Sequence, residues 1–365
     1  MRRHAMRKCI MLAAAMTPAA VGAQGWGDGS WRVAPQFMSY EIKTGGEKTT
    51  VAEFAMPLAY IQPISSRLTF DIATSFATVT TKIADAKSTM SGLTDTQLRF
   101  NYSLGEGAFV LTAGINAPTG QYKVDTAKVA AAGTIGNDFL SFPVSSFGNG
   151  FGGTGGVALA RTMGSWNLGL GASFRKSAEF GAFKADADEL RFTPADEVRV
   201  RAGLDREAFG GRVTFGLIYS SFGEDKTDDG SATPTTYSTG DRLIGQAALE
   251  APLGATQLYV GAWLLNRAEG EQVGGTAPGE NIYNLTVALG FNAGSLFLEP
   301  SVETRLWQVD GEKAGSLTFF GVRTRFESGS LLFSPSVSYG VGTLDGAAAA
   351  DIAGLRAGMT VRFAR

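Results

Sequence analysis

The chain has 365 residues, of which 44% are hydrophobic and 18% are charged, and its formal net charge is −2 at pH 7. This balance does not supply the basic surface that nucleic-acid binding needs, so we expect no nucleic-acid partner. The sequence holds one cysteine and one histidine, Cys9 and His4. Both lie near the N-terminus, so removal of that segment would leave the chain without a thiol or an imidazole.

Residues 1–23 are typical of a secretory signal peptide. Basic residues precede an apolar run from Cys9 to Met16, and the small residues Val21-Gly22-Ala23 follow as a cleavage site. Removal of this peptide leaves residues 24–365 without cysteine or histidine. That excludes Ser-His-Asp and Cys-His catalysis and ligation of zinc, haem or copper by these side chains. Catalysis by carboxylates alone remains open, but we expect no enzyme, no metal and no cofactor.

From Trp31 onward the sequence alternates between large apolar and small or polar residues, in stretches separated by turn residues. In 281–292, for example, Tyr283, Leu285 and Val287 lie on one face, and Asn284 and Thr286 on the other. These runs are longer than the roughly 5 to 6 residues of an average strand and match the 9 to 11 residues that cross a bilayer. The alternation therefore predicts transmembrane β-strands rather than a soluble sandwich.

We predict an all-β, transmembrane, antiparallel up-and-down barrel in the bacterial outer membrane, formed by residues 24–365 as a single domain. Connections after even-numbered strands are tight and those after odd-numbered strands are mostly longer, which indicates short periplasmic turns and longer extracellular loops. Fourteen strands remain the alternative if 48–62 or 150–163 is partly loop. The sixteen predicted strands are 31–43, 48–62, 66–83, 93–105, 107–117, 150–163, 165–178, 196–208, 211–223, 239–251, 255–267, 281–293, 295–308, 315–327, 329–342 and 351–363.

Aromatic residues near strand ends indicate an interfacial girdle on the lipid face, although aromatic residues are also common in strands generally. At the periplasmic rim we expect Tyr60, Tyr102, Phe109, Trp166 and Phe297. Toward the outer rim we expect Tyr40, Phe174, Tyr219, Tyr283 and Trp307.

The longest connection, residues 118–149, is too apolar for a freely solvated loop. We expect Asp125 to cap a short helix over 125–132, next to Lys128, and Phe139, Phe142 and Phe147 to pack on the barrel mouth or inside the lumen as a constriction. An apolar mouth of this kind suits amphipathic or aromatic substrates. The alternative is contact with a neighbouring barrel or packing of the loop on itself.

Three stretches near this loop carry a family resemblance. They are Gly92-Leu93-Thr94-Asp95-Thr96-Gln97-Leu98-Arg99-Phe100-Asn101-Tyr102, then Asn116-Ala117-Pro118-Thr119-Gly120, and then Gly148-Asn149-Gly150. Over about residues 92–175 the chain resembles the outer-membrane transporter family of the MetA pathway of phenol degradation, which is similar to FadL-type channels for fatty acids and aromatic hydrocarbons. The resemblance implies a channel, but residues 24–30 are too few for the N-terminal plug of FadL channels.

Two further stretches have simple interpretations. Residues 150–155 fit the pattern G-x-G-x-x-G, but strand-like sequence follows where a nucleotide-binding unit requires a helix, so we reject nucleotide binding. The acidic run 224–230, with Asp225, Asp228 and Asp229, lacks the spacing of a calcium loop. We expect a solvated loop tip there, with contact to cation-bridged lipopolysaccharide as the alternative.

The alternation places charged residues inside the barrel, because arginine facing lipid near the bilayer midplane costs about 2 to 4 kcal/mol. An excess of arginine in a wet lumen favours anions, whereas arginine–carboxylate pairs across strands would close it. Inward carboxylates include Glu53, Asp71, Asp205 and Glu250. The residues expected to line the substrate path are Arg99, Asn101, Arg175, Arg199, Arg201, Glu299, Glu303, Arg305, Arg323, Arg325, Arg356 and Arg362.

The sequence therefore predicts an outer-membrane channel for passive diffusion or uptake of small molecules. The alternative is a sealed structural or surface-interaction barrel without transport. Expected partners are outer-membrane lipids and lipopolysaccharide, a small-molecule solute, the barrel-assembly machinery through the C-terminal Phe363, and further copies of the chain in an oligomer.

Overall fold

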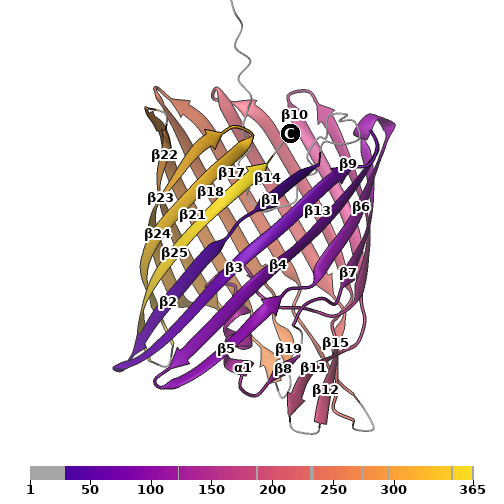
Figure 1. Ribbon diagram of the computed structural model, residues 1–365, viewed down its shortest axis with the longest axis vertical. Helices are drawn as coiled ribbons and strands as arrows, with labels where there is room; N and C mark the ends of the chain where they lie inside the picture. The colour runs from indigo at the N-terminus through magenta and orange to yellow at the C-terminus, as the bar shows by residue number, and fades with distance from the viewer. Residues whose placement is uncertain are drawn as a thin grey trace, which may run out of the picture.

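The computed structural model describes residues 29–363 except 122, 186–187, 231–233, 273–274, 295 and 347. These residues form a closed antiparallel β-barrel of sixteen strands (Figure 1). The expected signal peptide, residues 1–23, lies outside the described residues.

Two of the barrel strands are interrupted, so each consists of two segments. β1 (Ser30–Val33) and β2 (Gln36–Thr44) flank Ala34-Pro35, where proline has no N–H for the ladder. β5 (Ala86–Leu93) and β6 (Thr96–Leu104) flank Thr94-Asp95. The other barrel strands are β3 (Glu47–Pro63), β4 (Leu68–Ile83), β7 (Phe109–Ala117), β9 (Gly152–Met163), β10 (Trp166–Ser177), β13 (Glu197–Ala208), β14 (Gly211–Phe222), β17 (Arg242–Leu253), β18 (Thr256–Arg267), β21 (Glu280–Ala293), β22 (Leu296–Val309), β23 (Glu312–Ser328), β24 (Leu331–Leu344) and β25 (Ala350–Phe363).

The last strand closes the barrel onto the first. β25 pairs with β1 and β2 in continuous register, from Phe363 opposite Trp31 to Ala350 opposite Thr44. β3 and β9, the two stretches that sequence alone leaves open, are complete strands that pair on both sides. The prediction of sixteen strands is therefore confirmed over the alternative of fourteen.

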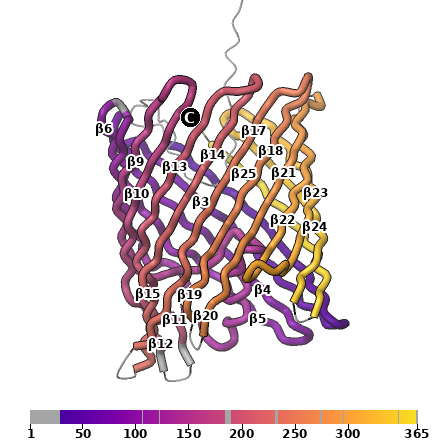
Figure 2. The backbone as a smooth tube through the Cα atoms, turned by 180° about the vertical axis from the view of Figure 1, so that it is seen from behind, coloured from indigo at the N-terminus to yellow at the C-terminus, as the bar shows by residue number. Residues whose placement is uncertain are grey.

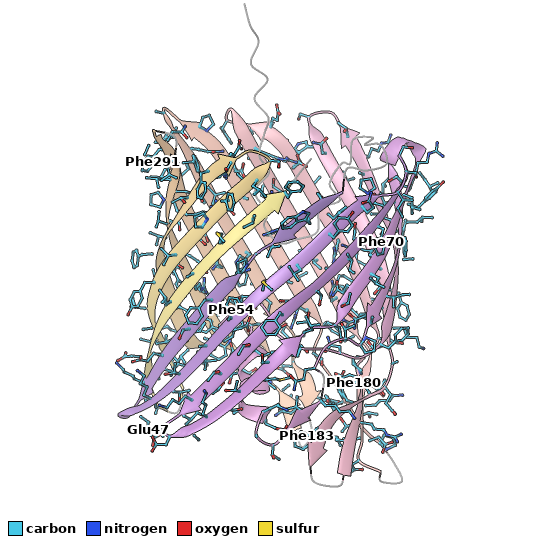
Figure 3. The ribbon with its side chains drawn as sticks, in the orientation of Figure 1. Glu47, Phe54, Phe70, Phe180, Phe183 and Phe291 are labelled. Carbon is cyan, nitrogen blue, oxygen red and sulfur yellow. The ribbon has the colours of Figure 1, made fainter. Side chains whose placement is uncertain are left out.

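Large apolar side chains cover the outer face of the barrel. On β21, Leu285 is 50% exposed while its neighbours Asn284 and Ala288 are buried on the inner side. Phe54 and Phe291 also lie on this outer face (Figure 3). So much exposed apolar surface is unfavourable in water, and it fits a face that contacts lipid.

No helix in the described ranges is long and apolar enough to cross a membrane.

The two ends of the barrel differ, and we call them the turn end and the loop end. At the turn end, where β1 begins and β25 finishes, tight turns use left-handed glycines such as Gly164 and Gly254. In barrels of this kind the short turns face the periplasm. Strands beyond the loop end form two small extra sheets (Figures 1 and 2): β8 (Val124–Asp125), β11 (Phe180–Ala185), β12 (Asp188–Thr193), β15 (Glu224–Asp228) and β16 (Thr235–Ser238) in one, and β19 (Gly270–Gln272) and β20 (Gly275–Ala277) in the other.

The expectation of a solvated acidic loop at 224–230 is wrong for residues 224–228, whereas Asp229 and Gly230 are exposed beyond the strand. Residues 224–228 are β15, which pairs with β12 and β16. Asp225 is buried, and it accepts hydrogen bonds from the Ala195 N–H at 2.9 Å and the Thr239 hydroxyl at 2.7 Å. Its carboxylate therefore holds the extra sheet together. Among the described residues, no group of three or more histidine, cysteine and acidic side chains is arranged to hold a metal ion.

Three of the predicted girdle aromatics face the lumen instead of lipid. Tyr40 is fully buried, Trp307 stacks on Phe139, and Phe297 lies beneath the Arg325 guanidinium. The sequence pattern misleads at Tyr40 and Trp307 because the inner wall is itself apolar where another segment packs on it. Phe174, Tyr219 and Tyr283 are exposed on the outer face, as predicted.

Substitutions on β21 test which face of this strand contacts lipid. Leu285→Arg places a charge against lipid and is expected to lower the free energy of unfolding by about 2 to 4 kcal/mol in bilayers. Thr286→Arg, on the opposite face and across from Glu303, is the matched control and is expected to cost much less. Urea unfolding in lipid vesicles measures both, and equal losses would contradict the assigned faces.

Candidate functional site

Residues 118–149 enter the barrel from the loop end, and we call them the inner segment. Its two ends are held by one carboxylate, Asp95, which is buried at the interruption between β5 and β6. Asp95 accepts hydrogen bonds from the Gly120 N–H at 3.0 Å, the Asn149 N–H at 2.7 Å and the Asn116 side chain at 2.8 Å. The two ends of the inner segment are therefore held next to each other at its base.

The same place requires two residues without side chains. A Cβ at Gly120 would lie 2.0 Å from the Phe147 carbonyl oxygen, and one at Gly148 would lie 2.8 Å from Asp95 Oδ1. Thr119 donates a hydrogen bond to the Thr94 carbonyl at 3.1 Å. The three stretches that carry the family resemblance thus meet at the base of the inner segment, which gives those residues a shared structural role.

Helix α1 (Val129–Ile135) packs against β4 and β5 near the loop end (Figure 1). Ser88 on β5 donates a hydrogen bond to the Ala127 carbonyl at 2.6 Å, while Ala131 and Ile135 are buried. The predicted helix over 125–132 is displaced, and Asp125 does not cap it. Asp125 instead pairs with Lys128 at 2.7 Å, and this hydrogen bond lowers the pKa of the Asp125 carboxyl.

Beyond α1 the inner segment crosses to the wall formed by β22, β23, β25, β2 and β3. The Tyr40 hydroxyl donates a hydrogen bond to the Leu140 carbonyl at 2.7 Å, and Arg305 donates to the Phe139 carbonyl. The Val144 N–H donates to Glu53 at 2.9 Å. Backbone groups of the segment are therefore paired with wall side chains, as buried polar groups must be.

Apolar contacts accompany these hydrogen bonds. The Phe139 ring stacks on Trp307 at 5.2 Å between centroids, and the Phe142 ring meets Tyr40 edge-on at 5.4 Å. Phe139, Phe142 and Phe147 are all buried. They do not form the apolar mouth suggested by the sequence, because they are used to fix the segment to the wall.

A charged cluster on β22 and β25 lies between the inner segment and the barrel wall. Glu303 pairs with Arg305 at 2.7 Å and with Arg356 at 3.2 Å, and it accepts a hydrogen bond from Asn284 at 2.9 Å. The Arg356 guanidinium also lies 3.6 Å from the Phe319 ring centroid. On the other side of the segment, Asp138 pairs with Arg242 on β17 at 3.0 Å.

The opposite half of the barrel carries small inward side chains. A Cβ at Gly169 would meet nothing within 4 Å, and one at Gly171 would first meet the adjacent strand at 3.5 Å. Gly169 therefore borders open space, and Gly171 has room for a methyl group in ordinary contact with the adjacent strand. The small inward residues of this half, which we call the open wall, are Thr112, Gly114, Thr154, Gly156, Ala158, Gly169, Gly171, Ser173, Gly203 and Gly216.

Four inward arginines lie toward the loop end of the open wall or on the neighbouring strand: Arg99 on β6, Arg175 on β10, and Arg199 and Arg201 on β13. Arg99 pairs with Asp71 at 3.0 Å, and Asn101 donates a hydrogen bond to the same carboxylate at 2.8 Å. Glu197 is buried and pairs with both Arg175, at 3.5 Å, and Arg199. Arg201 has no hydrogen bond or ion pair within the described ranges, and its Nε is buried without a partner.

The twelve predicted lumen residues thus fall into separate groups rather than one site. Arg99, Asn101, Arg175, Arg199 and Arg201 lie on the open wall, while Glu303, Arg305 and Arg356 lie under the inner segment. Nearer the turn end, Glu299 pairs with Arg323, Arg325 covers Phe297, and Arg362 lies opposite Arg32. Sequence reasoning missed the roles of Tyr40, Asp95, Asp138 and Glu197, because each depends on contacts between distant strands.

The fold and lumen define a membrane-spanning β-barrel with a segment of chain folded inside it. No protein-family model and no curated protein matches the sequence. The barrel is similar to the loop L8 deletion mutant of OmpT, an outer membrane protein of Vibrio cholerae, with 14% identity over 91% of this chain and 99% of that chain and a TM-score of 0.41. It is also similar to a triple mutant of Rhodopseudomonas blastica porin, with 13% identity over 92% and 100% of the two chains and a TM-score of 0.39.

A third similar structure is the deltaS2 mutant of the TodX monoaromatic hydrocarbon channel. The two chains are 9% identical, the match covers 93% of this chain and 90% of the TodX chain, and the TM-score is 0.44. Similarities at this level do not assign the chain to a family.

The Asp95 hydrogen bonds give a second test. Asp95→Ala leaves the Gly120 and Asn149 N–H groups unpaired, at about 1 to 3 kcal/mol each, so the inner segment is expected to detach while the barrel persists. Faster trypsin cleavage after Lys128 reports this detachment. The control is Asp351→Ala, which removes an exposed carboxylate at the loop end. Equal cleavage of the two variants would show that Asp95 does not hold the segment.

Proposed function

We propose that this protein is an outer-membrane channel through which small molecules diffuse passively, without an enzymatic step. The path follows the open wall of β7, β9, β10, β13 and β14, and the inner segment is the constriction that narrows the lumen beside it. Arg99, Asn101, Arg175, Arg199 and Arg201 line this path.

One observation carries the proposal, namely the asymmetry of the lumen. Inward side chains beneath the inner segment are fully buried whether they are large, such as Tyr40 and Leu317, or small, such as Ala77. Those across from it are mostly glycine, alanine, serine and threonine, and Cβ atoms added at Gly169 or Gly171 would have room. A wall of small residues leaves space for solutes, because pore width is set by the side chains that line it.

A sealed barrel is the second candidate, and ion pairs across neighbouring strands favour it. Arg212 pairs with Asp205 at 2.7 Å, and Arg323 pairs with Glu299. These ion pairs fix long side chains in the turn-end half of the lumen, where they would narrow it. In that case the extra sheets at the loop end would carry a surface interaction instead of transport.

Conductance in planar bilayers separates the two candidates. Wild-type protein is expected to give stable stepwise currents, and Gly169→Trp, which fills the open wall, is expected to reduce the unit conductance by at least about half. The matched control is Gly155→Trp, since Gly155 faces outward on the adjacent strand, opposite the outward Phe174. Absence of currents in wild-type protein would favour the sealed barrel, and equal effects of the two substitutions would contradict the proposed path.

A further inference from the structure

Arg201 differs from Arg99, Arg175 and Arg199 because no carboxylate among the described residues forms an ion pair with it. Arg99 has Asp71, and Arg175 and Arg199 share Glu197. Arg201 is only partly exposed and has no hydrogen bond or ion pair in the described part of the chain, and its Nε, like that of Arg175, is buried without an acceptor. A guanidinium left in this state is expected to take an anionic partner from solution.

The surroundings of Arg201 reinforce the positive charge. Arg99 and Arg199 are both close enough to repel it electrostatically, and Glu197 is the carboxylate that acts on it. The inner segment offers no further counter-ion, since Asp138 pairs with Arg242 and Asp125 pairs with Lys128. The four arginines thus face two carboxylates, which leaves an excess of positive charge on this part of the wall.

The residues between Arg99 and Arg201 leave room for a ligand. Gly114, Thr154, Gly156 and Gly171 lie on the three strands that separate β6 from β13, and their side chains are small or absent. Apart from Arg175, which lies across from Thr154, the wall between Arg99 and Arg201 is therefore lined by small residues at these positions.

An apolar surface adjoins the cationic one. Ile218 lies directly opposite Arg201 in the pairing of β13 with β14, and Ile244 lies opposite Ile218 on β17. Both project inward, and Ile244 packs against the buried cluster under the inner segment. A ligand held at Arg201 therefore has an apolar side chain beside it on one side and open lumen on the other.

We propose that Arg201, assisted by Arg99 and Arg199, binds the carboxylate of small organic anions whose apolar body lies against Ile218. The substrate class of the channel is then monocarboxylates with an aromatic or branched aliphatic body. A planar guanidinium offers two parallel N–H donors to one carboxylate, and of these four arginines only Arg201 lacks an ion pair in the described chain, which matches the single charge of a monocarboxylate. This assignment rests on the proposed function, because the site lies on the proposed path.

Equilibrium binding of benzoate to the purified, detergent-solubilised protein tests the site directly by titration calorimetry. Arg201→Gln is expected to weaken benzoate binding about tenfold, as loss of a charged hydrogen-bonding partner predicts. The control is Arg325→Gln, which removes the same charge from β23 near the turn end, and it is expected to change binding by less than about twofold. Circular dichroism of each variant verifies that the barrel is folded.

A substitution at Ile218 tests the apolar part of the site. Ile218→Ala is expected to weaken benzoate binding about fivefold and to leave acetate binding unchanged, because only benzoate carries a body that contacts this position. Equal effects on benzoate and acetate would remove Ile218 from the site. Inorganic phosphate binding as tightly as benzoate, with the same dependence on Arg201, would overturn the assigned ligand class.

Binding and conductance together separate this inference from the proposed function. Benzoate binding that depends on Arg201, in a protein that gives no bilayer currents, would support the site and contradict the channel. Currents without benzoate binding, or binding that falls equally in Arg201→Gln and Arg325→Gln, would contradict the site and leave the channel standing.

Discussion

The carboxylate of Asp95 fixes both ends of the inner segment, and the rest of the lumen is arranged around that constraint. Within the described residues of the segment the only helix is α1, which has seven residues, so most of the segment's backbone is not hydrogen-bonded within a helix of its own. Wall side chains complete the pairing: Asp95 at the base, Glu53 at Val144, Tyr40 at Leu140 and Arg305 at Phe139. Because unpaired backbone groups are costly in a buried setting, these contacts commit the segment to one half of the barrel.

The two halves of the lumen differ as a consequence. Beneath the segment the wall is apolar, and the charged groups Glu303, Arg305 and Arg356 are paired with one another. Across from it the wall is built from small residues, and the arginines there share too few carboxylates. The proposed passage and the proposed anion site both follow from this division, since the space and the uncompensated charge lie on the same side.

Much of the barrel could be predicted from the sequence, because alternation with a period of two is imposed by the pleat itself and persists over whole strands. Leu285 and Thr286 were assigned to the correct faces on that basis. Tyr40 and Trp307 were not, because an apolar residue facing the lumen looks the same in sequence as one facing lipid. The acidic strand β15 was mistaken for a loop, since its partners β12 and β16 lie elsewhere in the chain and polar strands carry no apolar pattern.

The site was less predictable than the fold. An inward arginine can be recognised from its position in a strand. That Arg201 has no ion pair within the described ranges depends on the register of β10, β13 and β14, and on the pairing of Glu197 with Arg175 and Arg199. The role of Asp95 could be suspected only from its place in a short motif. Contacts between residues far apart in the chain, which local patterns do not encode, decide both cases.

Cysteine accessibility tests the central claim most directly, because the described residues contain no cysteine and the one in the chain is Cys9. Gly171→Cys, on the open wall, is expected to react rapidly with a charged methanethiosulfonate reagent added to protein in liposomes. Ala77→Cys also faces inward, but Ala77 is fully buried beneath the inner segment, so it is expected to stay unmodified, as is the wild-type protein. Equal modification of both positions would show that the inner segment does not divide the lumen into a filled half and an open one.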